Sequence, residues 1–378
     1  MSESDPVPST AAPGDPAPDA AEVEAAADRV MTAALGWVDL MAIHLGSRLG
    51  WYDALVSRGP LDAAGLAAAT GTDARYAREW LEQQAASGWL VVEEADPAGP
   101  DDVAAARRFR IEAAFAEVLT DGASRSFMEP VARMFAASAA RLPDLLDAYR
   151  SGGGVSWEQL GRHAREAQAE MNRPWLEAMP EFLAEVPRVR AALTRPGARV
   201  ADLGMGAGWS SIALAAAHPG LRVEGFDVDE ASVALAKANA EAAGLADRVA
   251  FHLVDAARLA EHGPFDAVFA FECLHDMPHP VEVLAGVRAA LAPDGVAVIM
   301  DEATEDAFAP DAPPVERLLY GWSLFVCLPD GMSHGESAAT GTVMRVDTLR
   351  GYAQRAGWRD VRVIVPEFGL WRFYELVG

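Results

Sequence analysis

The sequence has almost no lysine and very little cysteine. Its 378 residues include one lysine, Lys237, and two cysteines, Cys273 and Cys327. A lysine nucleophile or Schiff base elsewhere in the chain is therefore excluded, and two cysteines cannot form a disulfide framework. No group of Cys and His residues has the spacing of a zinc site, so we expect no bound metal.

Positive charge is also scarce. Lys and Arg number 31 against 56 Asp and Glu, which gives a formal net charge of −25. A surface of this kind repels phosphate backbones and anionic lipids. The N-terminus lacks the basic and apolar regions of a signal peptide, and we expect no apolar run long enough to cross a bilayer. We therefore expect a cytoplasmic protein with no nucleic-acid and no membrane partner.

The length and the local composition divide the chain into parts. A chain of this size favours more than one domain. Residues 1–22 have no aromatic side chain and many Pro and Ala residues, which predicts a disordered tail. Residues 23–123 are expected to form a winged-helix domain, and residues 124–193 a helical connector. Glycines at 152–154 interrupt the connector, and the sequence leaves open whether they form a flexible joint or a lid.

The winged-helix prediction depends on short, well-separated elements. A short helix begins near Leu61, and a second helix is expected at 74–87, with Tyr76, Trp80 and Leu81 facing inward. Two strands, starting at Gly88 and ending at Ile111, would form the wing around a turn at 97–100.

From residue 194 to the C-terminus, strand patterns alternate with helix patterns. This alternation predicts an α/β fold, a Rossmann-like, doubly wound and mostly parallel sheet. The last two strands are separated by four residues, so they should form an antiparallel hairpin. The seven candidate strands are residues 198–203, 222–227, 249–254, 267–271, 296–301, 361–365 and 370–376.

A glycine-rich turn follows the first of these strands. It reads Asp202-x-Gly204-x-Gly206-x-Gly208 and opens the next helix. Glycines let the backbone approach a ligand closely, and the helix start offers free N–H groups. A dinucleotide fingerprint has the spacing Gly-x-Gly-x-x-Gly, whereas here the third glycine comes one residue earlier. Asp202 precedes the first glycine, where it could accept from the ammonium group of a bound amino acid.

Acidic residues stand at the ends of the next three strands. Asp227 ends the second strand, Asp255 the third and Glu272 the fourth. In open α/β sheets, ligands bind at these carboxyl ends. A carboxylate at Asp227 can accept both ribose hydroxyls, Val228 can lie against an adenine face, and Asp255 can accept from the adenine amino group. Each acid by itself could equally be a helix cap, but the succession favours an adenosyl site.

The segment from Asp202 to Asp301 resembles class I methyltransferases that depend on S-adenosyl-L-methionine (SAM). With the winged helix in front, the chain resembles small-molecule O-methyltransferases with an N-terminal dimerisation domain, including a bacterial winged-helix group. The resemblance implies SAM as cofactor, a seven-stranded sheet and a homodimer. It also implies that Asp202, Gly204, Gly206 and Gly208 hold the methionine part of SAM. Asp227 would then hold the ribose, and Val228, Asp255 and Ala256 the adenine.

Methyl transfer to a hydroxyl needs a base within hydrogen-bond reach, and histidine suits this role. In plant-type O-methyltransferases a His-Asp pair lies just past the fourth strand, and His275-Asp276 matches it. Two features depart from that pattern: Met277 stands where a tryptophan is usual, and Phe271 where a basic residue is usual. The sequence therefore leaves open whether His275 is the general base or packs against the following helix.

Three further residues could take part in the chemistry. Glu302 follows the fifth strand and could orient the imidazole, although a solvated carboxylate would look the same in sequence. His279 and His334 lie in loop-like stretches and are weaker candidates for the base.

The acceptor is expected to be small and partly apolar. Residues 318–328 form a helix that is apolar nearly all round, so it is buried in the core or lines a pocket. Arg133, Met134 and Phe135, on an earlier helix, could reach the same cavity.

Two other functions remain open at this point. One is a SAM-binding enzyme of the same fold that methylates nitrogen or carbon. The other is a winged-helix DNA-binding regulator, which the acidic composition and the mixed charges of the 74–87 helix disfavour.

Overall fold

The computed structural model describes residues 18–93 and 107–378. The predicted turn at 97–100 and most of the predicted disordered tail lie outside these residues. The chain divides into two compact units, residues 1–111 and 112–378. The connector predicted at 124–193 thus clusters with the C-terminal part of the chain.

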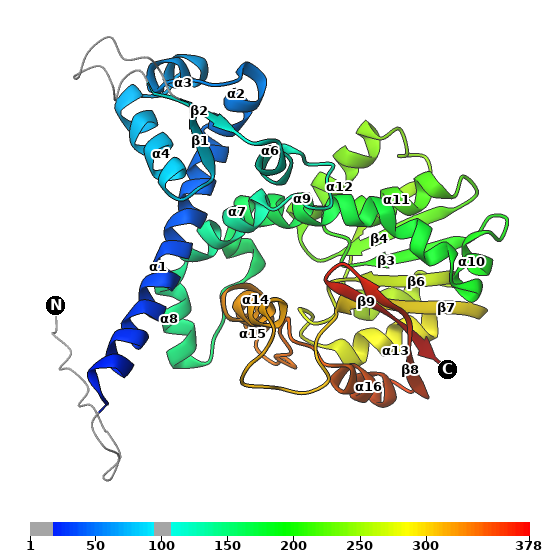
Figure 1. Cartoon of the computed structure of the whole chain (residues 1–378). Helices are drawn as coiled ribbons and strands as arrows, with labels where there is room; N and C mark the ends of the chain where they lie inside the picture. The colour runs from blue at the N-terminus through cyan, green and yellow to red at the C-terminus, as the bar shows by residue number, and fades with distance from the viewer. Residues whose placement is uncertain (1–17, 94–106) are drawn as a thin grey trace, which may run out of the picture. The chain divides into compact units, whose positions relative to one another are not determined.

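The first unit has the elements of a winged helix (Figure 1). Asp62 and Asp73 cap two of its helices by accepting from backbone N–H groups. Leu90–Glu93 and Arg108–Ile111 pair as antiparallel strands. The elements are α1 (Ala20–Arg48), α2 (Trp51–Arg58), α3 (Ala63–Thr70), α4 (Ala74–Ala86), β1 (Leu90–Glu93) and β2 (Arg108–Ile111).

The inward face of α4 differs in part from the prediction. Trp80 and Leu81 are buried as expected, but Tyr76 is 75% exposed. The buried positions are Ala77, Trp80, Leu81 and Gln84, which are spaced as one helical face. Tyr76 precedes that face by one residue, so it points away from the core of this unit.

The expectation that no apolar run could cross a bilayer is wrong for α1. This helix has 29 residues and a window of 18 residues with a mean hydropathy of 1.3, which suffices by length and composition. The reason is that residues 30–47 contain a single charged side chain, Asp39. Long helices of soluble proteins can have the same composition, so this finding is weak evidence for a membrane segment.

The second unit begins with helices and continues into the sheet (Figure 1). Its helices before the sheet are α6 (Ala113–Thr120), α7 (Glu129–Ala139), α8 (Leu142–Ser151), α9 (Trp157–Ala184) and α10 (Pro187–Leu193). Ser156 and Gln159 form a capping box at the start of α9, and the backbone of Gly161 leaves the helical conformation with φ of 80°. The predicted helical connector is thus four helices, α7 to α10.

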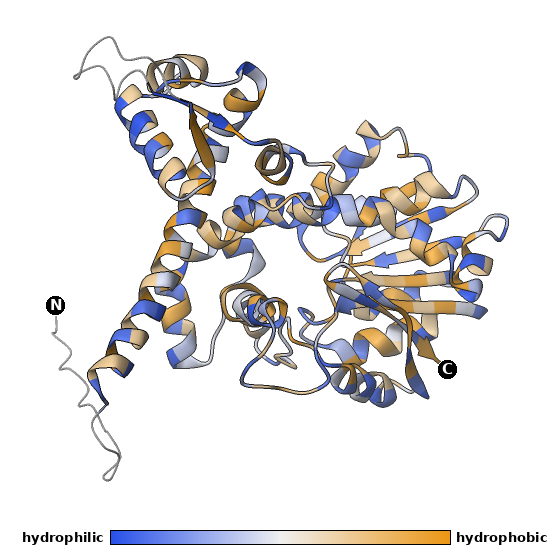
Figure 2. Cartoon of the chain, viewed as in Figure 1, coloured by the Kyte–Doolittle hydropathy of each residue, from blue (hydrophilic) through white to orange (hydrophobic). Residues whose placement is uncertain are grey.

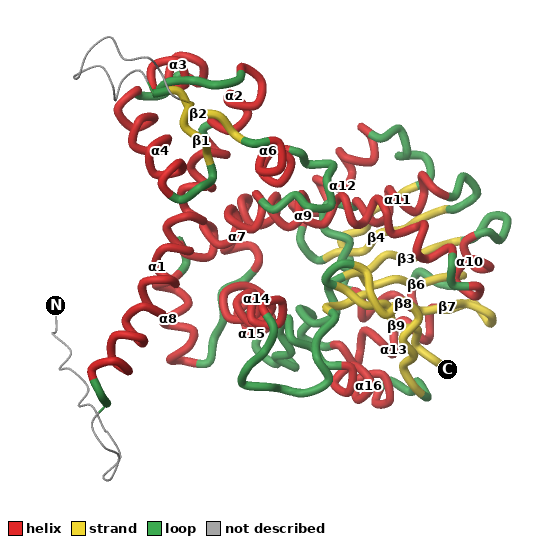
Figure 3. The backbone as a smooth tube through the Cα atoms, viewed as in Figure 1, coloured by secondary structure: helices red, strands yellow, loops and turns green. Residues whose placement is uncertain are grey.

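The sheet has seven strands in the order β5-β4-β3-β6-β7-β9-β8 (Figure 3). The first five strands of this order are parallel, and β9 is antiparallel to both β7 and β8. The predicted doubly wound sheet with a terminal antiparallel hairpin is confirmed. The strands are β3 (Arg199–Leu203), β4 (Arg222–Asp227), β5 (Val249–Leu253), β6 (Phe265–Phe271), β7 (Leu291–Glu302), β8 (Asp360–Phe368) and β9 (Trp371–Val377).

Helices cover both faces of the sheet, and Figure 2 shows apolar residues concentrated on its central strands. Side chains of α9 to α12 pack on one face, and those of η1, α13 and α16 pack on the other. Alternate residues of each strand face opposite cores; Val200 belongs to one and Ala201 to the other. The elements are α11 (Trp209–Ala217), α12 (Glu230–Ala242), the 3₁₀ helix η1 (Ala256–Glu261), α13 (Pro280–Ala290) and α16 (Val346–Arg355).

One further helical run lies between β7 and α16. It consists of α14 (Pro314–Trp322), a π-helical turn η2 (Ser323–Cys327) and α15 (Leu328–Met332). Leu319, Trp322 and Val326 are buried, whereas Leu324 is exposed.

The strand order reverses between β3 and β6, whose neighbours run in opposite directions along the chain. In open α/β sheets the crevice outside the carboxyl ends at such a point is where ligands bind. The residues predicted to bind the cofactor follow β3, β4, β5 and β6, so the topology gathers them at this edge.

Candidate active site

The glycine-rich turn after β3 has a backbone that glycine alone adopts easily. Gly204, Gly206 and Gly208 have φ of 58°, 52° and 78°. A Cβ on Gly204 would lie 2.7 Å from Cys273, and one on Gly208 would lie 2.8 Å from Phe251. The turn is therefore packed tightly from below, while Gly206 has open space on the side where its own Cβ would point.

Asp202 lies behind this turn at the end of β3 and is fully buried. Ser210 and Ser211, in the first turn of α11, donate to its Oδ2 at 2.6 and 2.5 Å. Its Oδ1 is buried and has no hydrogen-bond partner in the described chain. Burial raises the pKa of Asp202 to about 6, although the two serine hydroxyls oppose this. One oxygen thus ties strand to helix, and the other has unused capacity to accept.

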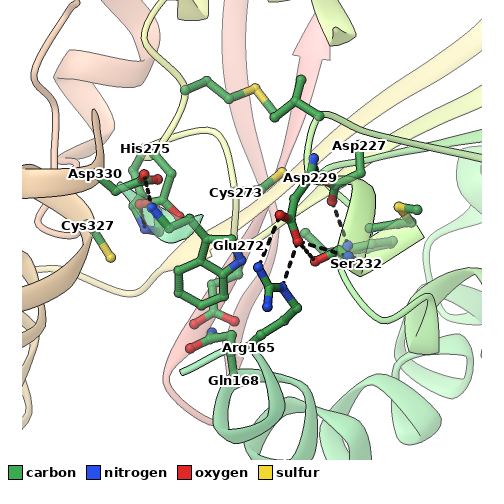
Figure 4. A pocket seen from close by; sticks show the side chains of 18 of the residues that line it. Arg165, Gln168, Asp227, Asp229, Ser232, Glu272, Cys273, His275, Cys327 and Asp330 are labelled. Carbon is green, nitrogen blue, oxygen red and sulfur yellow. Dashed lines mark hydrogen bonds and ion pairs between the residues drawn. The ribbon is translucent and has the colours of Figure 1, made fainter. Parts of the chain in front are cut away.

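Asp227, at the end of β4, fixes the middle of the glycine turn. Gly206 N donates to its Oδ2 and Asp229 N to its Oδ1, both at 2.9 Å. Burial raises the pKa of Asp227 despite these bonds. Arg165, from α9, binds Asp229 with Nε at 2.7 Å and Nη2 at 3.1 Å, as Figure 4 shows. A helix distant in sequence therefore holds the acidic loop after β4.

The residues expected to bind adenine lie at the ends of the same strands. Val228 is 66% exposed at the mouth of the cavity, and Ala256 is buried. Asp255 accepts from Ala257 N at 2.8 Å and so caps η1. The structure thus gives Asp255 the capping role that its sequence position also allowed, while leaving it on the cavity wall.

These residues line a cavity of about 520 Å³. Its wall continues from the glycine turn through the ends of β4, β5 and β6 to the helical run between α14 and α15. In Figure 4, Asp227, Asp229 and Ser232 lie at one end of the view, and His275, Cys327 and Asp330 at the other.

Glu272, at the end of β6, is held in an unusual backbone conformation. Its φ is 52°, which a glutamate rarely adopts. Its backbone N–H donates to Met300 O at 2.7 Å, and Asn172 Nδ2 of α9 donates to its side chain. Burial raises its pKa to about 7, against the nearby imidazole of His275. Strained residues of this kind are concentrated at functional sites.

His275 is 2% exposed and lies among three carboxylates. Its Nδ1 hydrogen-bonds to Asp301 Oδ1 at 2.8 Å and is 3.2 Å from Glu302 Oε2. Its Nε2 is 3.3 Å from Asp276 Oδ1. Burial by itself would lower the pKa of His275, but Asp276, Asp301 and Glu302 raise it well above 6.5. The imidazole of the ligand-free chain therefore retains its proton at neutral pH.

The carboxylates around His275 share the effect unequally. Burial raises the pKa of Glu302 well above its usual value, in spite of the imidazole. Burial also acts on Asp301, but the imidazole and its hydrogen bond keep the pKa of that carboxyl below its usual value. Asp301 is therefore the ionised partner of His275, a role that the sequence interpretation had given to Glu302.

The apolar wall of the cavity comes from the elements that the sequence indicated. Trp322, Val326 and Cys327 line it from the helical run, and Met134 lines it from α7. Arg133 and Phe135, the neighbours of Met134, have other contacts. Arg133 binds Glu129 and Glu170 at 3.0 and 2.9 Å, and Phe135 packs edge-to-face on Phe325.

The glycines at 152–154 are fixed against α15. A Cβ on Gly154 would lie 2.1 Å from Pro329 O, and Val155 N donates to that same oxygen at 3.0 Å. Trp157 N donates to Asp330 Oδ1 at 2.7 Å. In this structure the segment is therefore a docked connection between α8 and α9.

His279 and His334 are exposed residues at the cavity margin. Sequence reasoning missed Arg165, Asn172, Asp301 and Asp330, which come from α9, the end of β7 and α15. Asp301 had a signal, since it directly precedes Glu302 at a strand end. The others are ordinary helix residues in sequence, and tertiary packing alone brings them to the site.

Comparison with known proteins identifies the C-terminal part of the chain. Residues 194–321 match a family model described as a methyltransferase domain. The chain is 34% identical over 143 residues to the release factor glutamine methyltransferase of Gloeobacter violaceus, covering 34% of this chain and 49% of that protein. It is 36% identical over 102 residues to the 27-O-demethylrifamycin SV methyltransferase of Amycolatopsis mediterranei, covering 27% and 37%. The chain thus spans about a quarter to a half of the length of the curated relatives it matches.

Solved structures match over nearly the whole chain. The mitomycin 7-O-methyltransferase MmcR has a TM-score of 0.66 and 25% identity, covering 95% of this chain and 99% of that one. A putative O-methyltransferase from Nostoc punctiforme has a TM-score of 0.69 and 17% identity, covering 96% and 100%, and so shows the fold. The resemblance that the sequence indicated is confirmed: residues 194–321 are a methyltransferase domain, and the chain belongs to the class I, O-methyltransferase-like family of SAM-dependent enzymes.

Proposed function

We propose that this chain transfers a methyl group from SAM to an oxygen atom of a small, partly apolar acceptor, with His275 as general base. The observation that carries the proposal is the buried imidazole. It is held by Asp301 and lines the same cavity as the glycine-rich turn. A secondary metabolite is the expected acceptor, since the structural relatives include the mitomycin 7-O-methyltransferase.

The residues around the glycine-rich turn fit SAM. The positive φ of three glycines exposes backbone N–H groups at the start of α11, and the buried Oδ1 of Asp202 has unused capacity to accept. Asp202 and Glu272 would take the ammonium group, Asp227 the ribose, and Val228, Asp255 and Ala256 the adenine. Bound SAM supplies a methyl group activated by a sulfonium charge. Related folds occur in complexes with S-adenosylhomocysteine (SAH) and with SAM.

The chain's own residues would then manage the acceptor proton. Asp301 accepts from Nδ1–H of His275, which fixes the tautomer that keeps Nε2 available to the acceptor. The surrounding carboxylates raise the pKa of His275, so the imidazole must first lose a proton to act as a base. A positive charge nearby lowers the pKa of an imidazole, so cofactor binding favours the deprotonated form. The apolar wall formed by Trp322 and Val326 excludes water.

A second candidate is methyl transfer to nitrogen or carbon in the same cavity, where the acceptor needs no strong base. DNA binding is disfavoured by local contacts as well as by net charge. On α4, Arg75 pairs with Glu79 at 2.5 Å and Arg78 with Glu82 at 3.2 Å, so glutamates neutralise both arginines.

The proposed assembly is a homodimer through the N-terminal unit, in the cytoplasm. Support comes from α1, whose Val30, Met31, Leu35 and Val38 side chains are exposed within that unit.

The test measures SAM binding and SAH formation with a panel of phenols, using the full chain. Asp227→Ala should weaken SAM binding by about tenfold or more, because it removes a carboxylate that accepts charge-assisted hydrogen bonds. His275→Ala should leave SAM binding near normal and reduce turnover of a hydroxyl acceptor about 10²–10⁴-fold. Asp311→Asn, on an exposed loop, is the control. Full turnover by His275→Ala would favour the second candidate, and undiminished SAM binding by Asp227→Ala would refute the cofactor site.

A further inference from the structure

The acceptor end of the cavity carries more negative charge than its own cations balance. Eight carboxylates line the cavity, and among the described lining residues Arg165 is the sole arginine or lysine. That guanidinium is committed to Asp229 at the cofactor end. At the acceptor end, Asp276, Glu302 and Asp330 share a single buried imidazole, that of His275.

Asp276 and Asp330 form a pair of carboxylates that the proposed mechanism does not use. Asp276 follows β6 and Asp330 belongs to α15, and each raises the electrostatic cost of ionising the other. The Oδ1 of Asp276 is buried without a hydrogen-bond partner among the described residues. Asp330 accepts from Trp157 N at 2.7 Å, and its nearest cationic group is the exposed His334, at 3.9 Å. Burial raises the pKa of Asp330 to about 7, since no close cation stabilises its charge.

Two aromatic residues complete this end of the cavity. Trp157 and Trp322 both line it, and an indole face attracts a cation. Trp322 is 7% exposed, and its Nε1–H is buried without a partner in the described chain. That unused donor calls for an oxygen or nitrogen acceptor on a ligand, because a buried unpaired N–H group is costly. The cavity thus offers two carboxylates and aromatic faces together with one free donor.

We propose that the acceptor is a cation, a small aromatic or apolar molecule with a protonated amine that lies between Asp276 and Asp330. The inference depends on the proposed methyltransferase function and names its substrate class. An ammonium group between the two carboxylates would neutralise the excess charge, and Trp157 would add a cation–π contact. An acceptor with a carboxylate or phosphate in the same place would meet repulsion with no arginine to offset it.

The test uses three phenols that differ in one substituent: tyramine, 4-hydroxyphenylacetate and 4-(2-hydroxyethyl)phenol. Binding to the full chain, saturated with SAH and treated with EDTA, is measured by calorimetry. Tyramine should bind at least about tenfold more tightly than 4-hydroxyphenylacetate, with the neutral phenol between them. Asp330→Asn should reduce this ratio several-fold, because the amide keeps the bond to Trp157 N but loses the charge. Asp311→Asn, which changes the net charge equally, should leave the ratio unchanged.

Each other outcome has a defined meaning. If SAH itself does not bind, the proposed function fails, and the acceptor inference fails with it. If SAH binds but tyramine binds no better than 4-hydroxyphenylacetate, or neither binds, only the acceptor inference is overturned. His275, Asp276 and Cys327 also have ligand atoms within 4.8 Å of one another. If Mn²⁺ binds tightly, displaces tyramine and loses affinity in Asp276→Asn, the cation is a metal ion and the amine proposal is overturned.

Discussion

The contact between His275 and Asp301 allows a quantitative prediction. Both side chains are at most 2% exposed, and Nδ1 and Oδ1 are 2.8 Å apart. Asp301→Asn keeps the size of the side chain and removes its charge. The substitution also removes the acceptor that holds the imidazole in the tautomer with Nε2 free, since an amide can offer its N–H₂ to Nδ1 instead.

The expected loss follows from the burial of the pair. A hydrogen bond to a charged group contributes about 1.5–3 kcal/mol. At about 1.4 kcal/mol for each factor of ten, turnover should fall at least about tenfold from that bond. The wrong tautomer should extend the loss towards about 10⁴-fold, as in other histidine bases whose orienting carboxylate is lost. Affinity for SAM should stay within a few-fold of the wild type, because Asp301 does not line the cavity.

The pH profile separates this reasoning from simple damage to the fold. The wild-type imidazole must lose its proton to act, so kcat/KM should rise with pH through an acid limb set by His275. Removing the negative charge of Asp301 lowers the pKa of His275, so the acid limb of the variant should move to lower pH.

The assay is SAH formation from pH 5.5 to 9, with SAM binding measured at each end of the range. Glu302→Gln is the matched comparison, because Glu302 Oε2 is 3.2 Å from the same nitrogen. An Asp301→Asn variant with wild-type turnover and an unmoved acid limb would refute the reasoning. A severe loss in Glu302→Gln together with a mild one in Asp301→Asn would return the orienting role to Glu302.

Three further predictions concern the cofactor end of the cavity. Gly208→Ala should lower the free energy of unfolding by about 1–3 kcal/mol in chemical denaturation, since φ is 78° and the new Cβ would lie 2.8 Å from Phe251; unchanged stability would contradict the packing. Arg165→Met should weaken SAM binding several-fold in calorimetry, because Asp229 loses its partner; unaltered affinity would show that the loop holds without it. The raised pKa of Asp202 means that folding takes up a proton, so its contribution to stability falls as pH rises from about 4 to about 6. Asp202→Asn should therefore raise the unfolding midpoint of the ligand-free chain more at pH 8 than at pH 4.5, by up to about 3 kcal/mol; an equal change at both values would refute this.

Much of the fold could be predicted from the sequence because its signals are local. The β4 strand begins and ends at the expected residues, Arg222 and Asp227, and the positive φ of Gly204 agrees with the glycine-rich turn. The β7 strand is longer than expected and begins at Leu291, because a Pro-Asp-Gly segment that looks like a turn is included in it. The α1 helix was underestimated as an apolar run, because alanine-rich helices have no strongly hydrophobic core segment.

The candidate site was predictable where its residues follow strands and less so elsewhere. Strand ends meet at one edge of a parallel sheet, so Asp202, Asp227 and Asp255 could be placed together from spacing alone. Asp330 and Arg165 belong to helices, where a polar residue in sequence looks like any surface residue. Their positions depend on how α9 and α15 pack, which involves contacts across 64 and 173 residues of sequence.

The π-helical turn at Ser323–Cys327 has a consequence for how this cavity changes between relatives. A π turn holds one residue more than an α turn, and such turns often occur at functional sites. Removing one residue there would restore the α-helix and rotate everything that follows by about 100°. Asp330 would then leave the cavity wall, while the glycine-rich turn and the ends of β4 and β5 would stay in place. A single-codon deletion or insertion in this turn could thus exchange the accepted molecule and keep the methyl donor, a route to new specificity that substitutions at the cavity wall do not offer.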